Sequence, residues 1–349
     1  MHSDWESVRQ HAGTSLDNSI VQHFGDSRAE AQAAVCEDVT SPLTQTTLIQ
    51  ISGVDKTVFC QGQFTNDVSL VSDRHSQLSA YCSPKGRMLT CFRHFQCDDN
   101  YYLTLPQELA AAILKRLRLF VLRAKAELTA SDWLGLGLSG PNAETLLTEY
   151  LGQSTPTAVD EVLVSGALCT IRVPGPFPRF ELYGPAAPIL ACWQQLRQQA
   201  RPVGAAAWTL LDIRAGLPSV AEATQDAFVP QMANLDLVGG VSFHKGCYVG
   251  QEIIARMHYL GRLKRRMFRL CLDNIATRPA PGTDLFAPAL RGEQSVGQIV
   301  SSAPSPAGGS EALAVLIKEC LKADLQLADQ DGVAISQQAL PYAVPDIAA

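Results

Sequence analysis

The chain has 349 residues, a length that suggests two or three domains rather than one. Hydrophobic residues make up 46% of the sequence and charged residues 18%, so the chain can bury a sizeable core. With 28 basic and 34 acidic residues the formal net charge is −6, which argues against a general nucleic-acid coat protein but leaves room for a local basic patch.

The first part of the chain is predicted to be a polar extension followed by an α+β unit. Residues 1–45 have weak periodicity, with a short helix expected over 29–34. A strand at 47–51 and a short helix near 56–62 come next. Three further strands are expected at 77–81, 89–96 and 101–105. Pro106 then opens a helix whose apolar residues are Leu109, Ile113, Leu117 and Phe120.

The same order of elements appears a second time. The expected elements are a strand at 133–138, a helix at 141–150, strands near 161–164, 168–173 and 179–183, and a helix at 187–200. The anchors also match: Ile51-Ser52-Gly53 resembles Leu138-Ser139-Gly140, and a Pro opens the last helix of each unit. Any α+β chain yields some similar strings, but these anchors favour an internal duplication.

Beyond residue 200 the pattern changes twice. A helix is expected over 204–214, residues 219–262 have little periodicity, and short alternating strands are expected at 267–272, 283–286, 296–300, 313–317 and 325–327. Such strands predict a separate antiparallel β-barrel or sandwich. The expected segments are an N-terminal extension (1–45), a first α+β repeat (46–130), a second α+β repeat (131–262) and a C-terminal β-barrel (263–349).

The cysteines indicate a reducing compartment. Ten are present, none forms a C-x-x-C pair, and most lie among apolar residues. Residues 1–6 are polar and partly acidic, unlike a secretory signal, and no apolar run approaches eighteen residues. We therefore expect a cytoplasmic protein with no membrane partner.

Residues 243–252 hold the candidate chemistry. Cys247 lies between Gly246 and Gly250, with Lys245 two positions before it and Gln251 and Glu252 soon after. A nearby Lys and His would favour a reactive thiolate, and the glycines permit tight turns and close ligand approach. The alternative is one more buried cysteine. We expect Cys247, assisted by Lys245, to be the catalytic or reactive group.

Positive charge gathers in the same region. Residues 243–270 hold seven basic side chains and one acidic one, a local charge of +6 that leaves −12 on the rest of the chain. The basic strip, residues 256–269, is therefore a plausible site for a polyglutamate tail, a phosphate or an RNA backbone. A solvated linker face is the alternative.

These motifs resemble a known family. The segment 245–252, Lys-Gly-Cys-Tyr-Val-Gly-Gln-Glu, matches the K-G-C-Y-x-G-Q-E signature of the YgfZ family of folate-binding proteins, relatives of the glycine-cleavage aminomethyltransferase. Four further segments agree in order and spacing: Gln61–Val68, the Pro-Lys-Gly-Arg turn at 84–87, Ala215–Pro218 and Pro230–Asp236. The resemblance covers about residues 45–300. In the C-terminal barrel it rests mainly on the pattern of short alternating strands.

The resemblance implies both a fold and a ligand. The fold is a pseudo-duplicated, aminomethyltransferase-like α+β body followed by the C-terminal antiparallel β-barrel. The ligand is tetrahydrofolate or a one-carbon derivative. The implied folate-binding residues are Gln61, Thr65, Asn66, Asp67, Lys85, Arg87, Asn234, Tyr248, Gln251 and Glu252. From the residues themselves, the polar loop 61–67 is able to bond a pterin edge, or it is a helix cap and turn.

The resemblance also implies a role. Family members support the assembly or repair of iron–sulfur enzymes, including those that modify tRNA, so iron–sulfur client enzymes or assembly proteins are expected partners. The aminomethyltransferases carry acidic residues, one catalytic, in the segment aligned with 85–92, and typically Glu where this chain has Arg214. Here 85–92 has no carboxylate. One-carbon transfer needs a positioned proton-transfer group, so glycine-cleavage activity is not expected.

Three hypotheses therefore stand: a folate-binding accessory factor that uses Cys247, a folate-dependent transferase, and an RNA- or protein-docking module that uses the basic strip. A metal site at Cys91-x-x-His94-x-x-Cys97 is not expected, because on a strand His94 points away from the face shared by the two cysteines.

Overall fold

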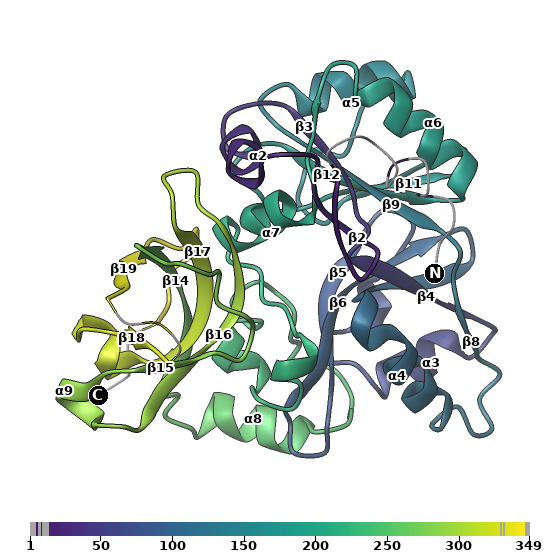
Figure 1. Cartoon of the computed structure of the whole chain (residues 1–349). Helices are drawn as coiled ribbons and strands as arrows, with labels where there is room; N and C mark the ends of the chain where they lie inside the picture. Colours follow the sequence, from purple (N-terminus) through teal and green to yellow (C-terminus); the bar gives the residue numbers. More distant parts are fainter. Residues whose placement is uncertain (1–4, 6–7, 9–13, 329, 331, 346–349) are drawn as a thin grey trace. The chain divides into compact units, whose positions relative to one another are not determined.

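Figure 1 shows the computed structural model, which describes residues 5, 8, 14–328, 330 and 332–345. Of residues 1–6, on which the cytoplasmic prediction partly rests, only Trp5 is among them. The chain divides into two compact units: unit 1 (residues 1–59, 68–77 and 93–211) and unit 2 (60–67, 78–92 and 212–349). Each unit is assembled from separated stretches. The division into four consecutive segments, 1–45, 46–130, 131–262 and 263–349, which we expect from the sequence, stays a prediction.

The order of the strands confirms the predicted duplication. The first copy forms a sheet in the order β5-β6-β7-β4, flanked by β8, and the second a sheet in the order β10-β11-β12-β9, flanked by β3 and β13. In both copies a helix follows the first strand and another follows the last. The strands of the first sheet are β4 (Thr46–Ser52), β5 (Gln77–Cys82), β6 (Met88–Cys97), β7 (Asn100–Pro106) and β8 (Glu127–Ala130). Those of the second are β9 (Leu134–Ser139), β10 (Val162–Ser165), β11 (Leu168–Arg172), β12 (Arg179–Gly184), β3 (Val39–Pro42) and β13 (Arg201–Pro202).

The helices lie close to where the apolar spacing predicts them. They are α2 (Ser27–Ala34), α3 (Lys56–Gln61), α4 (Gln107–Arg118), α5 (Ala143–Leu151), α6 (Ala186–Leu196) and α7 (Ala205–Arg214). In α4, Leu109, Ile113 and Leu117 are buried at a four-residue spacing. Phe120 was expected on the same face, but the helix ends at Arg118 and Phe120 is 41% exposed.

The sheet of the second copy is apolar on both faces. Leu134, Leu136 and Leu138 of β9 pack with α5 and α6, which cover one face of this sheet in Figure 1. Positions 135 and 137 of β9, both glycine, face the other side of the sheet, because successive residues of a strand alternate between its two faces. There Trp208 of α7 joins a second core that includes Phe95, Tyr102 and Tyr183.

The C-terminal part of unit 2 is an antiparallel sheet. Its six strands have the order β18-β15-β16-β17-β14-β19 and curl into a half-barrel around a buried aliphatic core. They are β14 (Arg265–Asp273), β15 (Asp284–Phe286), β16 (Ser295–Pro304), β17 (Ser310–Ile317), β18 (Gln326–Leu327) and β19 (Ala334–Gln338), with the short helix α9 (Pro288–Arg291) between β15 and β16. Five of these strands match the sequence prediction.

The prediction missed several short elements. The strands β1 (Ser15–Asp17), β2 (Ile20–His23), β3, β8, β13 and β19 are too short or too polar to show an alternating pattern. The helix α8 (Gln251–Tyr259) lies in the stretch where little periodicity was found. Only Ile254 of α8 is buried.

The packing of Gly137 makes a testable prediction. A Cβ added there would overlap the indole ring of Trp208, which is itself buried and cannot move aside easily. Gly137→Ala is therefore expected to lower the free energy of unfolding by about 1–3 kcal/mol, measured by denaturant titration. Gly246→Ala, where a Cβ would meet no heavy atom within 4 Å, is the control. Equal stability of Gly137→Ala and wild type contradicts this packing.

Candidate functional site

The segment 243–250 forms a loop that leads into α8, within unit 2. Gly250 immediately precedes the helix with a left-handed φ of 83°. Burial changes from residue to residue along the loop: Lys245 and Tyr248 are buried, whereas Gly246 and Cys247 are exposed. Cys247 is thus presented at the surface by two buried neighbours. The alternative of one more buried cysteine is excluded.

The buried ammonium group of Lys245 holds three backbone carbonyls. Its Nζ donates hydrogen bonds to the oxygens of Gln61 (2.9 Å), Phe64 (2.6 Å) and Asn66 (2.8 Å), which use all three of its donors. Its Nζ also lies 5.0 Å from the ring centre of Tyr248. Burial lowers the pKa of Lys245 to about 8, a shift opposed by Asp67. At neutral pH the group is therefore still mostly charged and fixes the turn 61–66.

The predicted folate loop 61–67 is itself tied to the chain before the motif. The hydroxyl of Thr65 donates to the carbonyl of Gly240 at 2.7 Å and accepts from the amide of Ala80 at 2.9 Å. The amide nitrogen of Asn66 donates to the carbonyls of Leu78 (2.9 Å) and Gly239 (2.7 Å). These two side chains therefore act as internal braces between the loop and residues 78–80 and 239–240.

The other two members of this loop pair with each other. The amide of Gln61 donates to Oδ1 of Asp67 at 2.9 Å. Gln63, which the sequence motifs did not single out, buries its side-chain oxygen with no hydrogen-bond partner among the described residues. This acceptor is open to a donor from outside the chain, either a water or a ligand N–H.

The Pro-Lys-Gly-Arg turn and the motif meet backbone to backbone. A Cβ on Gly250 would lie 2.5 Å from the carbonyl oxygen of Ser83 and 2.8 Å from the Cα of Gly86. A Cβ on Gly86, whose φ is 68°, would lie 2.9 Å from the Cβ of Ile253. Both positions require glycine for space and for conformation. The Pro-Lys-Gly-Arg turn and the motif 245–252 can therefore pack this closely only with glycine at positions 86 and 250.

Neighbouring contacts hold the same turn from its other side. The hydroxyl of Ser83 donates to Oδ1 of Asp226 at 2.6 Å. The guanidinium of Arg87 donates to the carbonyls of Asp226 (3.2 Å) and Ala227 (2.7 Å). Arg87 was predicted to bind folate, and these bonds also give it a structural task. Lys85 is exposed and makes no such contact to the residues that the structure describes.

Asn234 and its neighbours connect the motif region to the half-barrel. Asn234 is fully buried with a left-handed φ of 58°, and its amide nitrogen donates to the carbonyl of Met267 at 2.8 Å. Two residues on, Asp236 forms a paired contact with the guanidinium of Arg266 at 2.6 and 3.0 Å. The same Arg266 also donates to the carbonyl of Gln231 at 2.7 Å, so the predicted site residue Asn234 lies in a structural network.

The predicted folate-binding residues thus fall into two groups. Six have side-chain hydrogen bonds within unit 2: Gln61, Thr65, Asn66, Asp67, Arg87 and Asn234. Four make no side-chain hydrogen bond or ion pair to the residues described: Lys85, Tyr248, Gln251 and Glu252. Tyr248 is buried, and burial raises the pKa of its hydroxyl. Gln231, missed from the sequence, donates to the carbonyl of Ile254 but leaves its buried oxygen without a partner among the described residues.

The basic strip is smaller than its composition suggests. Arg266 is paired with Asp236, and Arg269 with Glu311 at 2.8 Å. Arg256, Arg262 and Lys264 are exposed, and Arg265 is half-buried. Arg214, which marked the departure from the aminomethyltransferases, also binds Glu311, at 2.6 Å. Arg214 and Arg269 therefore share one carboxylate inside unit 2.

Within the described part of the chain, no group of three or more His, Cys, Asp or Glu side chains could hold a metal ion. In the Cys91-x-x-His94-x-x-Cys97 pattern, the thiol of Cys91 donates to the carbonyl of Pro218 at 3.3 Å. The ring of His94 packs edge-on against Tyr101, with centroids 4.7 Å apart. Among the described helices, none is long and apolar enough to cross a membrane.

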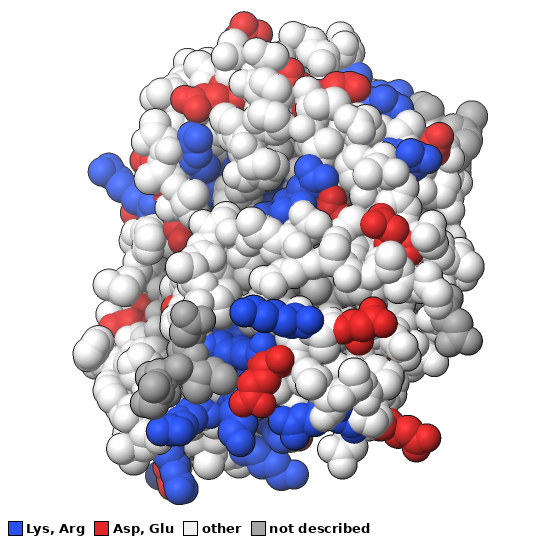
Figure 2. Space-filling model, turned by 90° about the vertical axis from the view of Figure 1, so that its left-hand side faces the viewer, with Lys and Arg blue, Asp and Glu red and all other residues white. Residues whose placement is uncertain are grey.

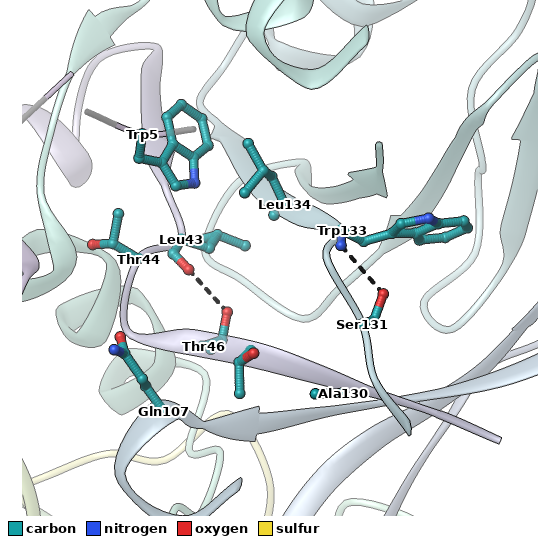
Figure 3. A pocket seen from close by; sticks show the side chains of 11 residues that line it. Trp5, Leu43, Thr44, Thr46, Gln107, Ala130, Ser131, Trp133 and Leu134 are labelled. Carbon is teal, nitrogen blue, oxygen red and sulfur yellow. Dashed lines mark hydrogen bonds between the residues drawn. The ribbon is translucent and has the colours of Figure 1, made fainter. Parts of the chain in front are cut away.

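A cavity of about 130 Å3 lies in unit 1, apart from the predicted site residues (Figure 3). Its polar lining is neutral and includes Thr44, Thr46 and Ser131, all of which already hydrogen-bond within the chain: Thr44 accepts from the amide of Val21, Thr46 donates to Leu43, and Ser131 accepts from Trp133. None of its lining residues carries a titratable acid, base or thiol. The cavity therefore offers neither a nucleophile nor a charged anchor.

Comparison with known proteins decides the family. A relative from Colwellia psychrerythraea named tRNA-modifying protein YgfZ is 31% identical over 298 residues, which span 84% of this chain and 90% of that protein. The chain belongs to the YgfZ family. A second relative of that name, from an Enterobacter species, is 29% identical over 301 residues, 86% of this chain and 91% of its own. No family model matches the sequence.

The fold of this YgfZ-family protein is that of the aminomethyltransferases. The crystal structure of glycine cleavage system aminomethyltransferase T from Bartonella henselae matches it with a TM-score of 0.81, covering 97% of this chain and 96% of that one. The two sequences are only 16% identical, so the likeness establishes the fold alone. It confirms the fold expected from the resemblance.

The Lys245 contacts predict a structural defect in a variant that lacks the ammonium group. Lys245→Met removes the donor and leaves three carbonyls without it. Because an unsatisfied buried polar group costs about 1–3 kcal/mol, the free energy of unfolding is expected to fall by at least that amount. Lys85→Met, the same change at an exposed lysine, should alter stability by less than about 0.5 kcal/mol. Indistinguishable denaturant curves for the two variants contradict this role.

The two glycines that flank Cys247 are expected to differ. Gly250→Ala adds a Cβ where the backbone of Ser83 and Gly86 leaves no space, and should lower stability by about 1–3 kcal/mol. Gly246→Ala should leave stability unchanged. Amide hydrogen exchange should show faster exchange over 83–88 and 246–252 in Gly250→Ala alone. The same protection in both variants would refute the close approach of these two turns.

Proposed function

We propose that this YgfZ-family protein is a cytoplasmic, folate-binding accessory protein that supports the assembly or repair of iron–sulfur enzymes, including those that modify tRNA. One observation carries the proposal: Cys247 is exposed on a loop whose backbone is held by a buried, fully hydrogen-bonded Lys245. A thiol that must meet a partner needs both access and a fixed position. The relatives' name, tRNA-modifying protein, supports the tRNA part of the proposal.

Cys247 differs from the other cysteines of the chain. Eight of the ten lie in strands or helices and are buried or half-buried, and only Cys36 and Cys247 are exposed. The thiol of Cys36 donates to the carbonyl of Gln32 at the end of α2, a local contact. Cys247 instead belongs to the family signature. An exposed sulfur can attack a disulfide or transiently hold a cluster iron, and either role fits an accessory factor.

The residues present fit folate in part. A folate ring offers N–H donors and acceptors, and its tail is anionic. Lys85 has an exposed ammonium group suited to the tail, and Gln251 and Glu252 can bond the donors of a pterin. The buried acceptors of Gln63 and Gln231 would gain partners from ring N–H groups. The six residues already engaged would hold the framework that carries these groups.

A transferase role has less support. The segment 85–92 supplies no carboxylate, and Arg214 is bound to Glu311 rather than placed as an acid or base. Proton transfer during one-carbon chemistry needs such a group. We therefore propose ligand binding without aminomethyl turnover.

The proposal predicts separate outcomes for the ligand and the thiol. In calorimetric titrations with tetrahydrofolate and 5-formyltetrahydrofolate, wild type and Cys247→Ala should bind with affinities within about twofold of each other. In a strain that lacks the protein, wild type and Cys36→Ala should restore iron–sulfur enzyme activity, and Cys247→Ala should not.

The folate-binding part and the thiol part of the proposal can each be disproved independently. No heat of binding with either folate would remove the folate part of the proposal. Full restoration of iron–sulfur enzyme activity by Cys247→Ala would remove the thiol part. Turnover of an aminomethyl donor by wild type would favour the transferase instead.

A further inference from the structure

The end of α8 and the start of the motif loop carry a ring cluster in which His258 and Tyr259 are exposed and Phe243 is half-buried. The rings of Phe243 and His258 are stacked, with centroids 3.7 Å apart and planes at 15°. Tyr259 contacts both rings edge-on, at 6.3 Å from Phe243 and 4.8 Å from His258. Tyr259 is 61% exposed, and the next residue, Leu260, is 83% exposed. The cluster is therefore ordered by its own contacts while much of it faces water.

Such an arrangement is unusual for a purely structural feature. A buried aromatic side chain contributes to folding by removing its area from water, whereas Tyr259 contributes little in this way. Grouped exposed apolar side chains mark surfaces that bind other molecules. The ring cluster is thus a candidate platform for a flat ligand.

Positive charge surrounds this platform. Arg256 is one turn before Tyr259 and Leu260 on α8, and Arg262 and Lys264 come directly after the helix. All three are exposed and make no ion pair to described residues, unlike Arg266 and Arg269 further along the strip. Figure 2 shows Lys and Arg side chains gathered at the lower edge of the face it displays.

We infer that the aromatic–basic patch, formed by Phe243, His258, Tyr259, Arg256, Arg262 and Lys264, binds single-stranded RNA. Stacking of bases on exposed rings beside guanidinium and ammonium groups is how proteins hold unpaired strands. A duplex hides the faces of its bases and would use only the cations. An acidic peptide would similarly leave the rings without a role, so the rings favour a strand with exposed bases.

The patch adjoins the reactive segment. Phe243 precedes Cys247 by four residues, a span of at most about 14 Å of extended chain. A strand stacked on the patch would therefore lie near the thiol. This inference goes beyond the proposed function and does not require folate binding.

The test uses the full-length protein and a fluorescein-labelled oligouridylate of about twelve nucleotides. Fluorescence anisotropy is measured from about 50 to about 300 mM potassium chloride. Saturable binding is expected, with log K falling against log salt at a slope of about −2, since three cations each contribute about −0.7 on a single strand. A blunt-ended RNA duplex and polyglutamate, which present charge without open bases, should bind at least about tenfold more weakly.

Substitutions separate the contribution of the rings to RNA binding from that of the charges. Tyr259→Leu should weaken binding by about fivefold or more with the salt slope unchanged, because only stacking is lost. Tyr259→Phe keeps the ring and should bind as wild type does. The triple variant Arg256→Ala, Arg262→Ala, Lys264→Ala should bring the slope close to zero. Lys115→Ala, which removes an exposed charge from α4 in unit 1, is the matched charge control and should change nothing.

Three outcomes overturn the inference: no binding of the oligouridylate at the lowest salt, polyglutamate or duplex binding as tight as the single strand, or equal binding by Tyr259→Leu and Tyr259→Phe. All the altered side chains are exposed, so each variant should keep its thermal midpoint, which is measured alongside. The triple variant should also keep the folate titration of wild type. Failure of folate binding in every variant would thus concern the proposed function, not this patch.

Discussion

A single buried charge organises the motif region. The ammonium of Lys245 lies away from water, where an isolated charge is strongly unfavourable, and three carbonyls of the turn 61–66 compensate it. Thr65 and Asn66 of that turn bond back to residues 239–240, just before the motif. The two segments thus fix each other in both directions. Because Lys245 is anchored in this way, Cys247 is held at the surface two residues further along the chain.

The signature therefore has two kinds of members. Lys245, Tyr248 and Gly250 build the frame, through hydrogen bonds, burial and the absence of a side chain. Gly246 and Cys247 are exposed, and Gly246 has room for a Cβ. A glycine with neither strain nor crowding in the free protein suits a position that a partner approaches. This separation is why framework and thiol can be tested by different substitutions.

The charges of unit 2 are divided in a similar way. Glu311 forms ion pairs with both Arg214 and Arg269, and Asp236 with Arg266, so two cations of the basic strip, Arg266 and Arg269, are held in ion pairs within unit 2. Paired, poorly hydrated guanidinium groups cannot attract a distant polyanion as free ones do. The cations that stay exposed lie beside the ring cluster of α8. Charge and aromatic surface thereby coincide at one end of this helix.

The sequence by itself determined the duplicated α+β order, five strands of the half-barrel and the importance of 245–252, because these depend on local periodicity and on a contiguous motif. It did not reveal α8, where only Ile254 is buried, or the polar strand β19. Only the tertiary structure decided that Lys245 is a clamp on residues some 180 positions earlier, and that Thr65, Asn66 and Asn234 are braces. A polar side chain has the same chemistry whether it binds a ligand or a backbone carbonyl. Which of the two it meets depends on segments far away in the chain.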